Sequence, residues 1–88
     1  MVSLGKTEKI YNKDKKTYYM VPVSLNRLSD LKWINSFASS CHSTYKKTTE
    51  SETNDKNQIK IVFFFKHEKY YERFRRKVKN YISYQVND

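Results

Sequence analysis

The stretch Ile59–Phe65, which reads Ile-Lys-Ile-Val-Phe-Phe-Phe, decides the fold of this chain. Side chains of a strand alternate between its two faces, and here every odd-numbered position is apolar. The even-numbered positions, continued to Lys66, place two apolar residues between two lysines. We therefore predict a strand over residues 58–66, with one face in the core and a mixed opposite face.

A helix is predicted directly after this strand, from about His67 to Tyr84. Its apolar stripe recurs at about 100° per residue, and a cationic face lies opposite, which is the pattern of an amphipathic helix. The stripe contains Tyr71, Phe74, Val78, Tyr81, Ile82 and Gln85, and the opposite face contains Lys69, Arg73, Arg76, Lys77 and Asn80. Residues 83–86 are also considered as a short final strand.

The first third of the chain predicts a hairpin. Lys6–Tyr11 and Thr17–Val23 are rich in Tyr, Val and Thr, and a turn-like lysine-rich segment separates them. Because proline cannot donate to a strand ladder, Pro22 predicts that the second strand ends near this residue or lies at a sheet edge.

A first helix is predicted after this hairpin. Ser24 is the expected cap of a helix that begins at Leu25 or slightly later and fades between Ser40 and Thr44. Trp33 projects off the main stripe, and we expect it at the edge of the core, with an interface as the alternative. The predicted buried stripe consists of Leu28, Leu31, Ile34, Phe37, Ala38 and Cys41.

The stretch from Tyr45 to Gln58 has no apolar residue from Lys46 to Asn57 and leaves two alternatives. It is either an exposed loop, or residues 43–51 form a charged edge strand with a hairpin turn at residues 54–57. The composition of this stretch favours neither the loop nor the edge strand.

Together these elements predict a single α+β domain over residues 1–88, a mostly antiparallel sheet of three to four strands covered on one face by two helices. Two architectures fit. In the ferredoxin-like βαββαβ order, the strands are residues 17–23, 43–51, 58–66 and 83–86. In the other, the N-terminal hairpin and the 58–66 strand form a three-stranded sheet.

The segment Lys60–Phe65 followed directly by a helix resembles the third strand and second helix of an RNA-recognition motif. That family places aromatic residues on an open sheet face, where bases stack. In that family's motif, small residues, especially glycine, alternate with the aromatic residues. This strand contains no glycine. The resemblance covers about a quarter of the chain, and we take from it only the shape of a sheet with two helices.

Composition narrows the class of protein. Aromatic residues make up 16% of the chain, which favours a folded domain, although a chain of 88 residues has a thin core. No apolar run has the length of a membrane span or a signal-peptide core. A single cysteine, Cys41, makes no internal disulfide, so we expect a cytoplasmic protein. Lysine-rich, glycine-poor usage is typical of AT-rich genomes and suggests a viral or mobile-element accessory protein.

Charge is the main functional signal. The net charge is +9, and residues 1–24, 25–47 and 67–88 each carry +3, so the excess is not a basic tail. Such a surface favours polyanions, above all nucleic acid. Our main hypothesis is a non-enzymatic protein that binds DNA or RNA without a cofactor. The expected phosphate-binding residues are Lys69, Arg73, Arg76 and Lys77 on the last helix and Lys13, Lys15 and Lys16 in the hairpin turn.

Two other classes remain open. A phage, virus or plasmid protein of this kind could dock on an acidic surface of a host protein as an inhibitor, with the mixed strand face and Trp33 as contacts. A small toxin-like nuclease would use His67 with Glu68 as acid and base, and replacing His67 or His42 would abolish its cleavage of RNA or DNA. The two histidines and Cys41 do not have the spacing of a zinc site, and Cys41 lies on the apolar stripe.

The mixed strand face also suggests a homodimer, in which a second copy would cover its apolar residues.

Overall fold

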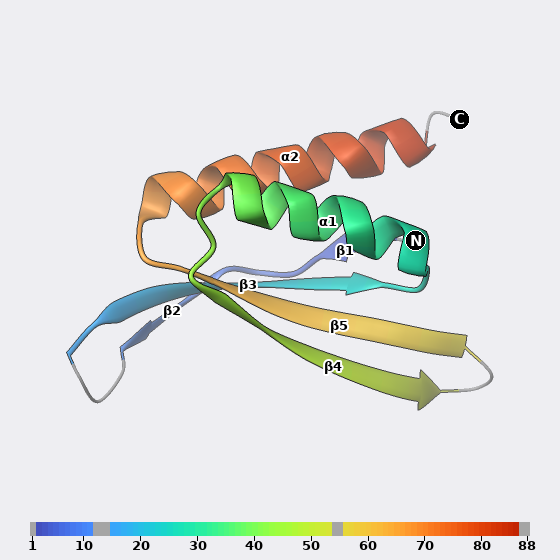
Figure 1. Ribbon diagram of the computed structural model, residues 1–88, viewed down its shortest axis with the longest axis horizontal. Coiled ribbons are helices and arrows are strands. Elements are labelled where there is room, and N and C mark those ends of the chain that lie inside the picture. The colour runs from blue at the N-terminus through green and yellow to red at the C-terminus, as the bar shows by residue number, and fades with distance from the viewer. Residues whose placement is uncertain (1, 12–14, 54–55, 87–88) are drawn as a thin grey trace.

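The computed structural model describes residues 2–11, 15–53 and 56–86 and contains a sheet with two helices (Figure 1). The chain is therefore an α+β fold, as the sequence predicts. Its elements in order are β1 (Ser3–Leu4), β2 (Glu8–Tyr11), β3 (Thr17–Leu25), α1 (Leu28–Ser40), β4 (Tyr45–Thr53), β5 (Lys56–Phe65) and α2 (Glu68–Val86).

All strand pairs of the five-stranded sheet are antiparallel. β3 and β5 lie at its centre, β4 pairs with the outer side of β5, and β1 and β2 both pair with the outer side of β3. The stretch from Tyr45 to Gln58, for which the sequence allowed either a loop or an edge strand, thus contains the edge strand β4. This strand pairs with β5 over its whole length. An edge strand needs no apolar face of its own, so its polar composition is compatible with pairing.

The sheet combines parts of both predicted architectures. β3, α1, β4, β5 and α2 follow the βαββα part of the ferredoxin-like order. The predicted final strand over residues 83–86 is wrong, because α2 continues to Val86. The amphipathic period of α2 runs through these residues, with Ile82 and Gln85 half-buried. In the ferredoxin-like order that final strand would pair with β3. Here β1 and β2 pair with β3 instead.

Pro22 lies inside a central strand, contrary to the prediction that it ends a strand or marks an edge. The N–H and C=O of a strand residue point to the same side. The carbonyl of Pro22 accepts a hydrogen bond of 2.9 Å from the Gly5 amide, so its nitrogen also faces Gly5. Gly5 lies in the interruption between β1 and β2, where no ladder hydrogen bond from position 22 is needed. The broken edge therefore accommodates the proline.

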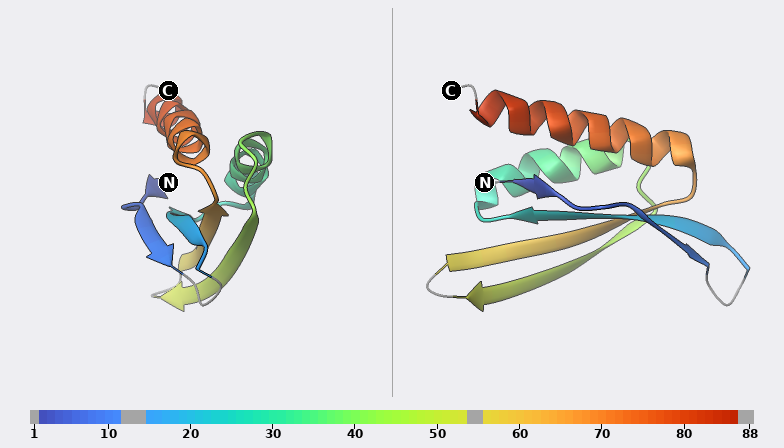
Figure 2. Two further views of the ribbon diagram at one scale, coloured as in Figure 1. Left: turned by 90° about the vertical axis from the view of Figure 1, so that its left-hand side faces the viewer. Right: turned by 180° about the vertical axis from the view of Figure 1, so that it is seen from behind.

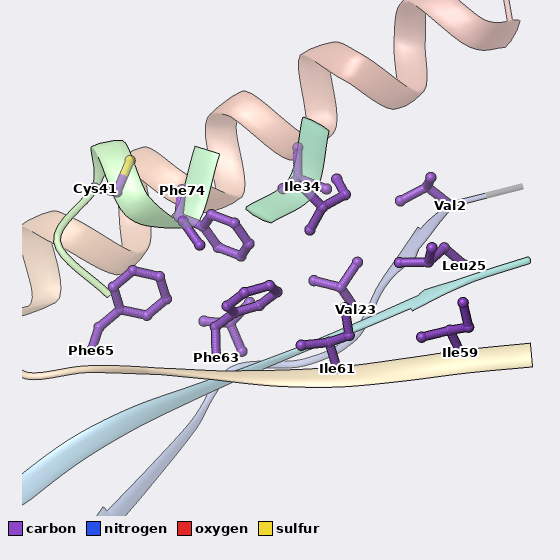
Figure 3. Close-up of a cluster of buried hydrophobic side chains, with 13 residues drawn as sticks. Val2, Val23, Leu25, Ile34, Cys41, Ile59, Ile61, Phe63, Phe65 and Phe74 are labelled. Carbon is purple, nitrogen blue, oxygen red and sulfur yellow. The ribbon is translucent and has the colours of Figure 1, made fainter. Parts of the chain in front are cut away.

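The core lies between the sheet and the helices (Figure 3). The odd-numbered residues of β5 from Ile59 to Phe65 are buried, as predicted, and Val21, Val23 and Leu25 of β3 extend the same layer. Phe74 of α2 packs against Phe63 and Phe65 with ring centroids 4.9 and 5.2 Å apart. Burial of these aromatic rings holds α2 on the sheet.

Both helices lie on the same side of the sheet (Figures 1 and 2). Ser24 does not cap α1, because β3 pairs with β5 as far as Leu25 and keeps Ser24 in the ladder. α1 begins at Leu28, and Arg27 before it makes no side-chain capping hydrogen bond. Leu28 is 72% exposed and is thus wrongly assigned to the buried stripe, whereas Ile34, Ala38 and Cys41 are buried as predicted.

Candidate functional site

The outer face of α2 carries three exposed cations, Lys69, Arg73 and Arg76. They follow one another at four- and three-residue steps, so they are neighbours on the helix surface. We call these three residues the cationic stripe. At 1.5 Å per residue, the stripe spans about 10 Å of the helix axis. The structure thus brings together the cations that the sequence predicts on this helix.

The acidic side chains of α2 flank this stripe, and Glu72 is a helix-surface neighbour of Arg76, four residues later. At 100° per residue, Glu68 and Glu72 lie on the side of α2 that faces away from α1. Lys77, the fourth predicted residue, lies on the opposite flank, toward α1, where its Nζ donates a hydrogen bond of 2.9 Å to Ser40 Oγ. The cationic surface therefore continues from the stripe toward α1.

Arg75 has a structural contact instead. Its guanidinium donates hydrogen bonds of 2.6 Å to the Gly5 carbonyl and 2.9 Å to Thr7 Oγ1. These bonds tie α2 to the segment between β1 and β2. The arginines of α2 thus divide into one that holds the fold and two, Arg73 and Arg76, that face outward.

The hairpin lysines lie on another part of the molecule. The β2–β3 hairpin extends from the end of the sheet, whereas α2 lies in the helical layer (Figure 1). Lys15 and Lys16 are exposed, and Lys15 has a left-handed backbone with φ of 60°. Lys13 lies outside the described residues. Lys15 and Lys16 therefore belong to a different layer of the fold from the cationic stripe.

A groove of about 660 Å³ lies beside the stripe, between α1 and α2. Trp33, Phe37 and Tyr81 pack against one another, with ring centroids 5.8 to 6.5 Å apart. Trp33 is 57% exposed and Tyr84 is 76% exposed, so both offer ring faces to solvent. The groove is lined by Trp33, Phe37, Lys77, Asn80, Tyr81, Tyr84 and Gln85.

Sequence reasoning did not find this groove. It placed Trp33 at the core edge or an interface and Tyr81 and Gln85 on the buried stripe of α2. The signal available was the position of Trp33 off the main stripe of α1, which left a large ring without a place in the core. Only the packing of α1 against α2 brings Trp33 beside Tyr81.

A buried carboxylate fixes the two helices beside this groove. Asp30 is 3% exposed, and its Oδ1 accepts hydrogen bonds from Tyr81 Oη at 2.6 Å and from Gln85 Nε2 at 2.8 Å. Its Oδ2 has no hydrogen-bond partner among the described residues. Burial first, then the hydrogen bond to Asp30, raises the pKa of Tyr81 above its usual value. This hydroxyl therefore keeps its proton and acts as a donor.

The two histidines considered for the nuclease alternative both contact the same aromatic ring. The Tyr70 ring centroid lies 5.0 Å from that of His42 and 5.3 Å from that of His67, and Lys69 Nζ lies 5.3 Å from it. Cys41 is buried. Within the described part of the chain, no three His, Cys, Asp or Glu side chains are grouped as metal ligands would be. In the same part, neither helix is long and apolar enough to cross a membrane.

Comparison with known proteins identifies no relative. No protein-family model matches the chain, and no curated protein or solved structure is significantly similar to it.

Proposed function

We propose that this chain is a non-enzymatic nucleic-acid-binding protein that holds the phosphate backbone on the cationic stripe of α2. The observation that supports this proposal is the exposure of Lys69, Arg73 and Arg76 on one helix face, with Glu72 at the edge of that face. Each strand of duplex DNA carries one charge per about 3.4 Å of the axis, so a stripe of about 10 Å matches about three phosphates of one strand.

The proposal predicts a definite salt dependence. If the stripe and Lys77 each neutralise one phosphate, the slope of log affinity against log salt is about −4 on duplex DNA and about −3 on single strands. Lys15 and Lys16 increase the slope only if a bound strand also reaches the hairpin.

The test is a salt titration with single- and double-stranded DNA and RNA. The double variant Arg73→Ala/Arg76→Ala should weaken binding and reduce the magnitude of the slope by about 2. Lys60→Ala/Lys66→Ala is the matched control, because it removes two exposed charges from β5 and the loop that follows it. Undetectable or salt-independent binding refutes the proposal. An equal loss in the control shows that net charge alone attracts the polyanion.

A second candidate is an interaction protein of a virus or mobile element that docks on an acidic host protein. The observation in its favour is the sheet face opposite the helices. Met20 pairs with Phe64 and Pro22 pairs with Val62, so these four apolar residues share that face. Recovery of one stoichiometric protein from a nuclease-treated cytoplasmic lysate, lost in Val62→Lys, supports this candidate. A dimer in light scattering that Val62→Lys dissociates indicates a second copy instead.

The nuclease alternative has its own readout in the binding assay. The shared contact of His42 and His67 with Tyr70 is the observation that keeps it testable. Cleavage of the bound nucleic acid that is lost in both His42→Ala and His67→Ala assigns a nuclease. If the nucleic acid stays intact after prolonged incubation, the nuclease alternative is wrong and the result agrees with a non-enzymatic binding protein.

A further inference from the structure

The groove between α1 and α2 adjoins the cationic stripe. Lys77 lines the groove and is one helical turn from Arg73. Asn80, another lining residue, is one turn beyond Arg76. A strand whose phosphates lie on the stripe therefore has its bases within reach of the groove.

We propose that this groove receives an unpaired nucleobase, so that the partner is single-stranded nucleic acid. This inference rests on the proposed function and names its substrate class. The bound base stacks on the exposed rings of Trp33 and Tyr84, which line the groove from α1 and α2 respectively. Stacking of this kind tolerates any base, because every base has a π face.

The charge of the lining favours a nucleotide over a basic ligand. Among the described residues, the lining includes one cation, Lys77, and no acidic residue. The neighbouring carboxylate, Asp30, is buried and holds its hydrogen bonds from Tyr81 and Gln85. Apolar walls beside a cation suit a planar ring attached to an anionic backbone, and the volume is within the range of small-ligand sites.

Duplex nucleic acid cannot fill the groove without losing pairing. Its bases are stacked inside the helix, and turning one outward costs a few kcal/mol in general. The phosphates of a duplex can still reach the cationic stripe. We therefore expect duplex binding through the stripe and Lys77 alone, and tighter binding of a single strand, in which the stacking contacts are added.

Trp33 allows a direct test because it is the only tryptophan in the chain. Titration with oligothymidylate or oligouridylate should quench its fluorescence with the same Kd that anisotropy of a labelled strand gives. Trp33→Ala and Tyr84→Ala should each weaken single-strand binding about 5- to 150-fold and leave duplex binding unchanged. Tyr11→Ala is the matched control, since this tyrosine is 69% exposed on β2. Both groove side chains are exposed, and circular dichroism verifies that the variants fold.

The outcomes separate this inference from the proposed function. If nucleic acid binds and Arg73→Ala/Arg76→Ala weakens it, but the Trp33 and Tyr84 variants bind normally, the groove inference is wrong and the proposed function stands. If no nucleic acid binds, both are wrong. Quenching of Trp33 by poly(Glu,Tyr) without any by oligonucleotides assigns the groove to an acidic protein and also overturns the inference.

Discussion

Replacing Tyr81 with phenylalanine removes one oxygen atom from the contact between α1 and α2. In the folded protein this oxygen donates a hydrogen bond of 2.6 Å to Oδ1 of Asp30, which is 3% exposed. Water cannot readily replace the lost donor at so buried a site. The Gln85 amide, at 2.8 Å, is the remaining donor to that oxygen.

The expected cost follows from the charge and burial of the acceptor. Hydrogen bonds to charged groups contribute about 1.5–3 kcal/mol, and a buried acceptor left without its partner carries the full desolvation penalty. We expect Tyr81→Phe to lower the free energy of unfolding by about 1.5–3 kcal/mol. For a domain of this size, the corresponding fall in Tm is about 6–24 °C.

Urea unfolding followed by far-UV circular dichroism measures this effect, with Tyr84→Phe as the matched control. Tyr84 is on the same helix but is 76% exposed, so loss of its hydroxyl should change stability by less than about 0.5 kcal/mol. In an Asp30→Ala background, Tyr81→Phe should cost little, because its acceptor is gone. A cost below about 0.5 kcal/mol for Tyr81→Phe, or the same cost with and without Asp30, refutes this reasoning.

Three further perturbations test how the elements are joined. Arg75→Ala removes two hydrogen bonds to the N-terminal segment and should lower the free energy of unfolding by about 1–3 kcal/mol in urea unfolding; a change within about 0.5 kcal/mol contradicts this role. Gly5→Ala places a Cβ 2.6 Å from Pro22 Cγ and should cost about 1–3 kcal/mol in the same assay, and a neutral variant shows that the edge shifts freely. Burial is the main cause that raises the pKa of both Tyr71 and Tyr81, with nearby carboxylates next in order. Since the unfolded chain then loses these protons first, stability should fall as pH rises from about 9 to about 11, and less so in Tyr81→Phe.

The features that depend on a local residue pattern, namely the buried face of β5 and the faces of α2, were predictable from the sequence. Alternation in Ile59–Phe65 identified the buried face of β5, and the 100° period identified α2 and its cationic side. A helix face is determined by residues three and four apart, so Lys69, Arg73 and Arg76 could be grouped before any tertiary structure was known.

The details that depended on a partner element were not predictable. Pro22 argued against a central strand because its missing N–H counts as a lost ladder bond. The structure avoids that loss by interrupting the neighbouring strand at Gly5, which is 17 positions earlier in the chain. Similarly, Ser24 has the composition of a helix cap, but pairing with Lys60 of β5 keeps it in the sheet.

The same distinction separates the two parts of the candidate site. The cationic stripe belongs to one helix, whereas the groove needs Trp33 of α1 beside Tyr81 of α2, 48 positions later. Asp30 joins these helices, so the hydrogen bonds that stabilise the fold also set the width of the groove. Tyr81→Phe should therefore weaken single-strand binding more than duplex binding, because the stripe remains in place while the aromatic walls lose their fixed separation. Equal weakening of both would mean that the groove has no part in choosing the strand.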